Sequence, residues 1–174
     1  MRLMSVKTTS YPGREITQED LKEGKYLHIV QKVEPRYSWA AGVAISRFLN
    51  ELKEGRIIGR KCSKCARTLV PPRMYCEQCF RPTDEWAYVR DTGTINTYSI
   101  SHVAADASRL KKPLLVAVVE LDGASPGMGI LHTLGDIEPS RVKVGMKVQA
   151  VWKPSEEREG AITDIRYFKP IEEA

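Results

Sequence analysis

The chain has 174 residues, which is enough for one domain or for two small domains that share a surface. Hydrophobic residues make up 42% of it and charged residues 28%, the ordinary composition of a globular protein. No apolar run approaches the roughly 18 residues of a membrane helix, and residues 1–9 lack the apolar block and cleavage site of a signal peptide. These observations exclude a membrane-spanning protein, argue against secretion and predict a cytoplasmic location. The net charge of +5 favours anionic partners, whether nucleic acid, phosphate-bearing cofactors or acidic protein surfaces.

The first part of the chain carries few structural signals. We expect residues 1–35 to form an N-terminal arm, in which Thr17 and Asp20 make a capping-box-like start to a short helix that ends at Gly24. Residues 26–33 alternate weakly in hydrophobicity, which favours a strand or an extended segment. Pro35 then interrupts the chain.

Residues 36–58 are expected to hold a docking helix. From Ser38, the expected N-cap, to about Lys53, apolar residues repeat at spacings of three and four, and Gly55 marks the end. A helix this apolar must be covered by another surface. The sequence leaves open whether the chain's own core or a partner subunit covers it.

The four cysteines form two pairs, Cys62-Ser-Lys-Cys65 and Cys76-Glu-Gln-Cys79, separated by ten residues. Each C-x2-C pair can form a tight turn that directs two thiolates at one centre, and two such turns supply the tetrahedral sulfur ligands that zinc prefers, at about 2.3 Å each. Because all four ligands are cysteines, no coordination position stays open, and we predict a structural zinc site. Two disulfides, a thioredoxin-like redox pair and iron in place of zinc are the less favoured alternatives.

The residue after the second cysteine of each pair is unusual for a zinc knuckle. Glycine is common there because the turn often needs a left-handed backbone, but Ala66 and Phe80 occupy the two positions in this chain. We therefore expect backbone strain at both knuckles.

Residues 86–174 have the pattern of an all-β domain with five strands and one helical turn, at about 136–141, between the third and fourth strands. This order is typical of the five-stranded OB-fold barrel, although an SH3-like barrel would give a similar pattern. The expected fold is therefore mainly β with some α: an N-terminal helix, a rubredoxin-like four-cysteine zinc ribbon at 59–85 and a C-terminal OB-fold barrel at 86–174. The expected strands are Thr94–Val103, Leu114–Leu121, Met128–Leu134, Lys147–Trp152 and Ala161–Phe168.

The residues give no positive case for catalysis. His28, His102 and His132 lie far apart in the sequence, and none stands beside a serine or cysteine nucleophile motif. Histidines on barrel strands, such as His102 and His132, more often complete hydrogen bonds of the barrel than act as catalytic bases.

Several motifs occur together in an order that is specific to one family. Over about residues 36–168 the chain resembles the zinc-ribbon/OB-fold proteins of domain-of-unknown-function family thirty-five. Its departures from the family are Ala66, Phe80 and the longer segment before Pro35. The motifs are Arg60-Lys-Cys-Ser-Lys-Cys65, Leu69-Val-Pro-Pro-Arg73, Cys76-Glu-Gln-Cys79, Gly93-Thr-Ile, Pro113-Leu-Leu-Val-Ala-Val-Val-Glu-Leu-Asp122, Gly129-Ile-Leu and Val144-Gly-Met-Lys-Val148.

This resemblance implies a non-catalytic scaffold that forms a hetero-oligomer with acyl-CoA enzymes. Family members associate with thiolases, with hydroxymethylglutaryl-CoA synthase or with acyltransferases. The barrel there helps to bind the CoA portion of acyl-CoA, while the ribbon and the helix dock the enzymes. The reaction, in which a cysteine forms an acyl thioester, belongs to the partner.

A basic surface suits the phosphates of CoA. Candidate contacts are Arg73 together with Arg109, Lys111 and Lys112, the last three being expected in the polar loop between the first two barrel strands. Pantetheine would lie along an apolar strand face, for which Tyr98, Ile100 and Met128 are candidates. The alternative is that the basic residues are solvated loop charges.

Nucleic-acid binding is the competing hypothesis, because zinc ribbons and OB-folds both bind nucleic acids. An OB-fold that binds single strands stacks bases on exposed aromatic side chains. The barrel strands offer four aromatic residues without dense interleaving of basic ones, which makes nucleic acid the less favoured partner. These residues are Tyr98, Trp152, Tyr167 and Phe168.

Overall fold

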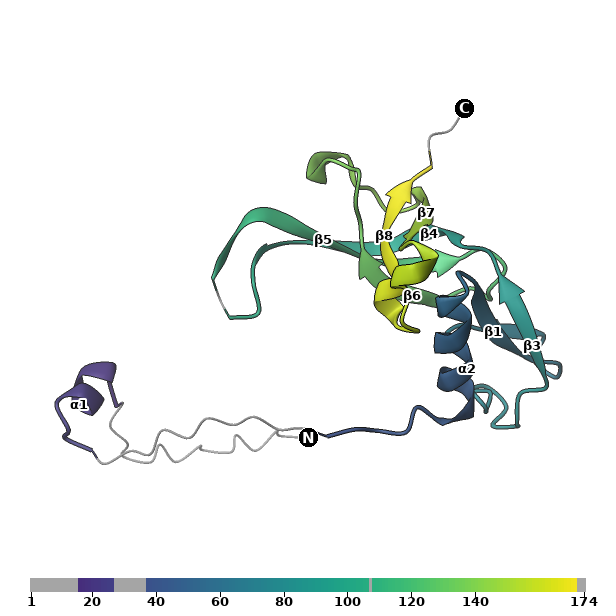
Figure 1. Ribbon diagram of the computed structural model, residues 1–174, viewed down its shortest axis with the longest axis horizontal. Helices are drawn as coiled ribbons and strands as arrows, with labels where there is room; N and C mark the ends of the chain where they lie inside the picture. Colours follow the sequence, from purple (N-terminus) through teal and green to yellow (C-terminus); the bar gives the residue numbers. More distant parts are fainter. Residues whose placement is uncertain (1–15, 27–36, 107, 172–174) are drawn as a thin grey trace, which may run out of the picture. The chain divides into compact units, whose positions relative to one another are not determined.

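The computed structural model describes residues 16–26, 37–106 and 108–171 and divides the chain into two units, residues 1–39 and 40–174 (Figure 1). In the first unit, helix α1 (Gln18–Lys22) begins with the expected capping box. The Asp20 amide donates to the Thr17 hydroxyl at 3.2 Å, and the Thr17 amide donates to the Asp20 carboxylate at 3.1 Å. The expected strand or extended segment at 26–33 lies almost wholly outside the described residues.

The second unit contains a helix, a small sheet and a barrel. Helix α2 (Gly42–Lys53) precedes a three-stranded antiparallel sheet with the strand order β2-β1-β3. A five-stranded antiparallel sheet of order β6-β5-β4-β7-β8 follows, and a bridge between Leu134 and Phe168 brings its two edge strands together. This arrangement confirms the expected fold class. The strands are β1 (Ile57–Cys62), β2 (Arg67–Leu69), β3 (Glu85–Val89), β4 (Thr92–Val103), β5 (Arg109–Leu121), β6 (Gly129–Thr133), β7 (Lys147–Trp152) and β8 (Ile165–Pro170).

Three short 3-10 turns interrupt the connections of the barrel. The turn Pro139–Arg141 lies between β6 and β7, where one helical turn is expected. The turns Ser155–Glu157 and Ile162–Asp164 lie between β7 and β8. The last strand therefore begins at Ile165 rather than at Ala161, because residues 162–164 are held in a turn.

The start of α2 also differs from the sequence prediction. The helix begins at Gly42, so the prediction of Ser38 as its N-cap is wrong; the N-cap position is Ala41, which has no side-chain oxygen to accept a hydrogen bond. The helix end is as expected, since Gly55 follows it with a φ of +73°.

The apolar face of α2 is covered by the chain's own core. Phe48 and Leu52 are buried in one cluster with Ile57 of β1 and with Val119 and Phe168 of the barrel. Of the two alternatives for covering the helix, packing within the chain therefore holds for this face.

The ribbon is joined to the barrel and to α2 by specific contacts. Thr68 of β2 donates its amide to the Ser125 hydroxyl at 2.9 Å, and the Ser125 amide donates to the Thr68 carbonyl at 3.0 Å. The Trp86 ring lies under the guanidinium groups of Arg47 and Arg60, at 4.4 and 4.7 Å from its centroid. Such cation–π contacts fix the helix and the ribbon sheet to each other.

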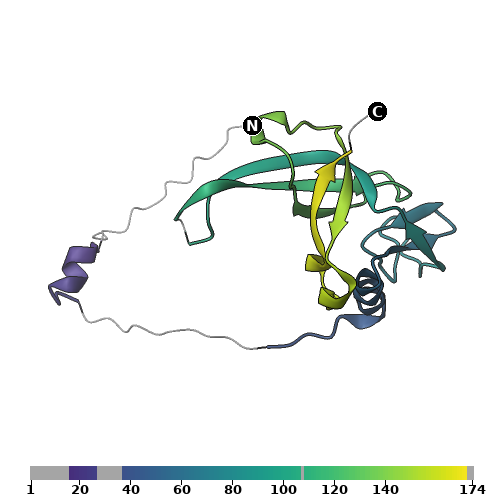
Figure 2. The ribbon, with the colours of Figure 1, turned by 45° about the horizontal axis from the view of Figure 1, so that its top comes forward.

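Strands β4 and β5 extend well beyond the barrel. β7 pairs with β4 only over Thr92–Thr94, and β6 pairs with β5 only over Val116–Glu120. Residues 99–106 and 108–114, called the arm from here on, therefore form a two-stranded hairpin. Figures 1 and 2 both show the arm pointing away from the ribbon.

The connection before β8 depends on one buried carboxylate. Asp164 is fully buried and accepts hydrogen bonds from the amides of Glu159, Gly160 and Ala161 at 3.0, 2.7 and 3.0 Å. Burial alone would raise the pKa of Asp164, but these backbone donors and the Lys153 ammonium at 3.9 Å outweigh it and hold the pKa below its usual value.

We therefore expect Asp164→Asn to lower the free energy of unfolding by about 2 kcal/mol at neutral pH. A carboxylate with a lowered folded pKa stabilises the protein above its unfolded pKa, about 3.9, and this contribution disappears as the pH falls through the folded pKa. Urea unfolding of wild type and variant at neutral and acidic pH measures the difference.

The exposed neighbour Glu159→Gln is the matched control and should change stability little at either pH. Loss of metal at low pH affects all three proteins alike and therefore cancels in the comparison. An Asp164→Asn effect that is equally large at both pH values would contradict the account.

Candidate metal centre and ligand-binding surfaces

The four cysteine sulfurs converge on one point. Cys62 ends β1, Cys65 lies in the turn to β2, and Cys76 and Cys79 lie in the connection from β2 to β3. All four Sγ atoms lie within 4.8 Å of one another, and those of Cys62 and Cys79 are 3.6 Å apart. Ligands at about 2.3 Å from a tetrahedral zinc are separated by about 3.8 Å. The four cysteines thus fit a single metal ion.

Both knuckles have the strained backbone that the sequence predicts. Ala66 has a φ of +51° and Phe80 a φ of +56°, in the left-handed region that glycine tolerates best. An L-residue there costs about 1–2 kcal/mol. The strain at the two knuckles is therefore offset elsewhere, and metal ligation is the strongest local source of stability.

Backbone amides prepare one of the sulfurs for metal binding. The amides of Cys79 and Gln78 donate to the Cys76 sulfur and lower the pKa of this thiol to about 7. In the absence of metal charge, the neighbouring Cys79 sulfur and burial raise the pKa of Cys65 to about 12. A metal ion replaces the remaining thiol protons when it binds.

Polar contacts hold the loops that carry the ligands. The Ser63 amide donates to Asp84 at 2.6 Å, which ties the first knuckle to the end of the second. The buried Arg60 donates to the Thr83 hydroxyl at 2.9 Å, and this hydroxyl donates to the Arg73 carbonyl at 2.8 Å. The centre has four cysteine sulfurs on loops that hydrogen bonds hold in place, as a structural zinc site requires.

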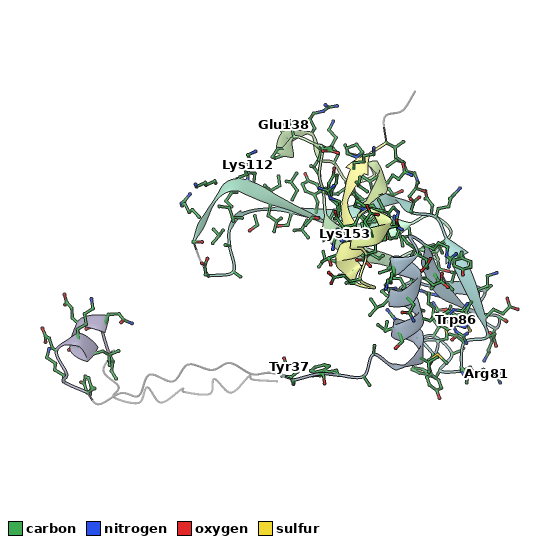
Figure 3. All side chains as sticks on the ribbon, viewed as in Figure 1. Tyr37, Arg81, Trp86, Lys112, Glu138 and Lys153 are labelled. Atoms are coloured by element: carbon green, nitrogen blue, oxygen red, sulfur yellow. The ribbon has the colours of Figure 1, made fainter. Side chains whose placement is uncertain are left out.

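The structure groups three of the four predicted phosphate contacts. Arg109, Lys111 and Lys112 lie on strand β5 within the arm, rather than in a loop as expected. Lys112 is labelled in Figure 3. None of the three forms an ion pair with a carboxylate of the described residues. Arg73 lies apart from them on the ribbon and pairs with Glu77 at 3.7 Å.

The predicted pantetheine contacts also lie in two separate places. Tyr98, at the base of the arm, is 38% exposed and stands opposite Ala117, while Ile100 stands opposite Leu115. Tyr98 and Ile100 therefore share one face of β4. Met128 lies in the loop before β6 and is only 9% exposed, so little of its side chain is available to a ligand.

A cleft of about 620 Å³, which the sequence did not predict, lies between β6 and the beginning of β8. In OB-folds, ligands bind at the face of the second and third strands near the loop between the last two, and this cleft has the same position. The one sequence signal for it is the apolar residue Leu131 in the middle of β6. In the structure the Leu131 side chain is 67% exposed. The cleft is lined by Val116, Leu131, His132, Thr133, Lys153, Ile162, Thr163, Ile165 and Arg166.

His132 in this cleft has partners for both ring nitrogens. Nδ1 accepts a hydrogen bond from the Thr133 amide at 2.9 Å, and Nε2 lies 3.2 Å from the Ile162 carbonyl, to which it donates in that tautomer. The ring also packs edge-on against Phe168. These contacts match the expected role of a barrel histidine that completes local hydrogen bonds.

Most of the barrel aromatics are committed to structure. Phe168 is fully buried, the Trp152 indole donates to Asp91 at 3.2 Å, and the Tyr167 hydroxyl donates to Asp136 at 2.9 Å. Of the four aromatic residues considered for base stacking, Tyr98 alone counts among the exposed large apolar side chains. This distribution offers no platform for successive bases.

The described part of the chain contains no helix that is both long and apolar enough to cross a membrane.

The fold and the metal centre define a zinc ribbon joined to an OB-fold. Family models match both parts: "ChsH2, rubredoxin-like zinc ribbon domain" over residues 49–85 and "ChsH2, C-terminal OB-fold domain" over residues 86–153. A DUF35 domain-containing scaffold protein from Methanocaldococcus jannaschii is 34% identical over 119 residues, which cover 67% of this chain and 82% of that protein. The chain belongs to the DUF35 family.

A more distant relative is a probable enoyl-CoA hydratase alpha subunit from Thermomonospora curvata, 26% identical over 100 residues. The match covers 58% of this chain but only 30% of that protein, so it concerns one part of a longer polypeptide.

Two solved structures are similar in fold. A DUF35 protein of unknown function from Sulfolobus solfataricus has a TM-score of 0.55 at 33% identity, and the match covers 63% of this chain and 78% of that chain. A structure described as the Ltp2-ChsH2(DUF35) aldolase has a TM-score of 0.54 at 22% identity, covering 79% of this chain and 98% of that one. At this identity the second match shows the fold alone.

We expect Cys62→Ser or Cys79→Ser to release the metal and unfold the ribbon, because zinc contributes on the order of 10 kcal/mol in comparable peptides. Elemental analysis of the purified proteins measures zinc and iron per chain. Lys64→Ala, at an exposed position between the first two cysteines, should keep the metal. Unchanged metal stoichiometry in the cysteine variants would show that the ligand assignment is wrong.

Proposed function

We propose that the protein is a non-catalytic accessory subunit of an enzyme complex that acts on acyl-CoA. Helix α2 and the ribbon dock an enzyme of the thiolase, hydroxymethylglutaryl-CoA synthase or acyltransferase type, and the barrel contributes contacts to the CoA portion of the substrate. The partner supplies the catalytic residues. The observation that carries the proposal is the 34% identity to most of a relative named as a scaffold protein. The relative named as an enoyl-CoA hydratase subunit agrees with CoA thioesters as the substrate class.

Phe80 supports docking through the ribbon. Its left-handed backbone costs about 1–2 kcal/mol, yet its side chain is 82% exposed, so packing within the chain does not offset this cost. Tyr75, in the same connection, is 64% exposed, and Val43 on α2 is 68% exposed. Exposed apolar side chains on the ribbon and on α2 are therefore candidates for contact with another protein.

The arm supports contact with a coenzyme that the partner holds. An isolated two-stranded hairpin is marginally stable in water, so an enzyme that covers the arm would stabilise it. The cations of Arg109, Lys111 and Lys112 are unpaired among the described residues and are available to phosphates. Tyr98 at the base offers apolar surface to the rest of the coenzyme. Arg73, on the ribbon, is a separate contact in this proposal.

The first test is an affinity capture of the tagged full-length protein from its own host at moderate salt, analysed by mass spectrometry. We expect a near-stoichiometric acyl-CoA enzyme. Phe80→Gly should reduce this capture at least tenfold while leaving stability unchanged or higher, because glycine relieves the strained backbone. Val144→Asp, at a position 64% exposed on the β6–β7 loop, should not affect capture.

Recovery of RNA or ribosomal proteins that nuclease treatment removes would overturn the proposal in favour of nucleic-acid binding. That function also predicts oligonucleotide affinity with a steep dependence on salt. Capture that Phe80→Gly leaves unchanged would show that the ribbon is not the docking surface.

The second test uses the captured complex. We expect Lys111→Glu combined with Lys112→Glu to weaken CoA binding at least tenfold in calorimetry, since two cations near phosphates become anions. Lys64→Glu in the ribbon reverses one lysine away from the arm, half the charge change of the double variant, and should leave CoA affinity within about twofold. Equal affinity in the arm variant and wild type would show that the arm does not contact the coenzyme.

A further inference from the structure

A groove that the proposed function does not use lies beside the turn Pro139–Arg141. It encloses about 510 Å³ between this turn, the beginning of β7 and the end of β8. A second hollow of about 620 Å³ adjoins it and shares Arg141, Met146, Pro170 and Ile171 in its wall. We call the two together the basic groove. Glu138, labelled in Figure 3, precedes the turn at its rim.

Unpaired cations line the basic groove. Arg141 and Lys143 lie in the connection from β6 to β7 and Lys169 lies on β8, and none of these three side chains forms an ion pair or a hydrogen bond with the described residues. Lys147 also lines the groove but is paired with Asp122 at 2.9 Å. Like charges brought together without ion-pair partners create a positive potential, which an anionic ligand would neutralise.

Apolar surface lies beside these cations. Ile137 and Met146 are half-buried in the groove wall, and Ile171 is 40% exposed at its edge. The Gln149 side chain adds an amide donor and acceptor, and the Asp136 carboxylate, which accepts from Tyr167, adds a further acceptor. A free inorganic anion would use only the cations, whereas a ligand that carries both phosphate and a flat ring would use all of these groups.

We propose that the basic groove binds a nucleoside phosphate. The phosphates contact Arg141, Lys143 and Lys169, and the base lies against Met146 and Ile171 with its polar edge toward Gln149. Each of the two hollows, at about 510 and 620 Å³, falls within the roughly 300–1,000 Å³ of small-molecule sites. No aromatic residue lines the groove, which disfavours a track for successive nucleic-acid bases. The site does not depend on the docking of an enzyme.

Calorimetry of the isolated full-length protein with ADP at low salt tests the site. We expect saturable binding of one ADP per chain, weakened at least tenfold by Arg141→Ala combined with Lys169→Ala. Lys111→Ala combined with Lys112→Ala, which changes the arm alone, should leave ADP affinity unchanged. Ile171→Ser should weaken binding of ADP but not of pyrophosphate, because only the nucleoside uses the apolar wall.

Comparison of ADP with CoA identifies the source of the nucleotide. If ADP and CoA compete, and the Arg141/Lys169 variant binds neither, the groove takes the nucleotide end of a coenzyme. If ADP binds and CoA does not, the groove takes a free nucleotide. The proposal is wrong if millimolar ADP does not bind, if the groove variant retains ADP affinity, or if only single-stranded oligonucleotides bind there. Each of these results leaves the enzyme-capture experiment unaffected, so the two proposals can fail separately.

Discussion

Everything in the ribbon depends on the convergence of four sulfur atoms within 4.8 Å. The ribbon sheet contributes few residues to the hydrophobic core, and its two knuckles place Ala66 and Phe80 in backbone conformations that disfavour them. A shared metal ion is the interaction strong enough to outweigh both deficits. The contact of Trp86 with Arg47 links the ribbon to α2, and the paired hydrogen bonds of Thr68 and Ser125 link it to the barrel. The metal therefore positions distant surfaces as well as its own ligands.

The sequence predicted the features whose signals are local. The metal ligands follow from C-x2-C spacing, the capping box from Thr17 and Asp20, and the five barrel strands from β-rich runs bounded by glycine and proline. Ser38 was misassigned as the N-cap because a serine just before an apolar repeat is a typical cap, whereas the helix begins only at Gly42 and leaves Ser38 outside it. The sequence predicted a loop for residues 109–112 because their polar side chains face water on both sides of the hairpin. Pairing with β4 places these residues in a strand. The cleft and the basic groove could not be predicted in this way. Both form only when the barrel closes, which brings together residues such as Leu134 and Phe168 that no sequence pattern relates to each other.

The positively charged side chains of the protein fall into two groups, those with partners in the structure and those without. Some cations are internal braces: Arg60 binds Thr83, Lys147 binds Asp122, and Arg47 covers Trp86. Others stand free of described carboxylates on the arm and in the basic groove. Net charge alone could not distinguish these roles, since a braced arginine and a free lysine count equally in composition. Their separation in the structure is the reason for two separate proposals, a partner-held coenzyme at the arm and a small anionic ligand in the groove.

The arm also bears on how the protein behaves when it is alone. Beyond the barrel, no strand of the described residues pairs with the outer edges of β4 and β5, and such edges readily template pairing with another chain. Arg109, Lys111 and Lys112 place like charges along one of these edges, so two copies of the arm repel each other. An acidic or neutral extended segment meets no such barrier. The same cations thus discourage self-association while leaving the edges open to a different protein, which is a form of selectivity that precedes any contact with a ligand.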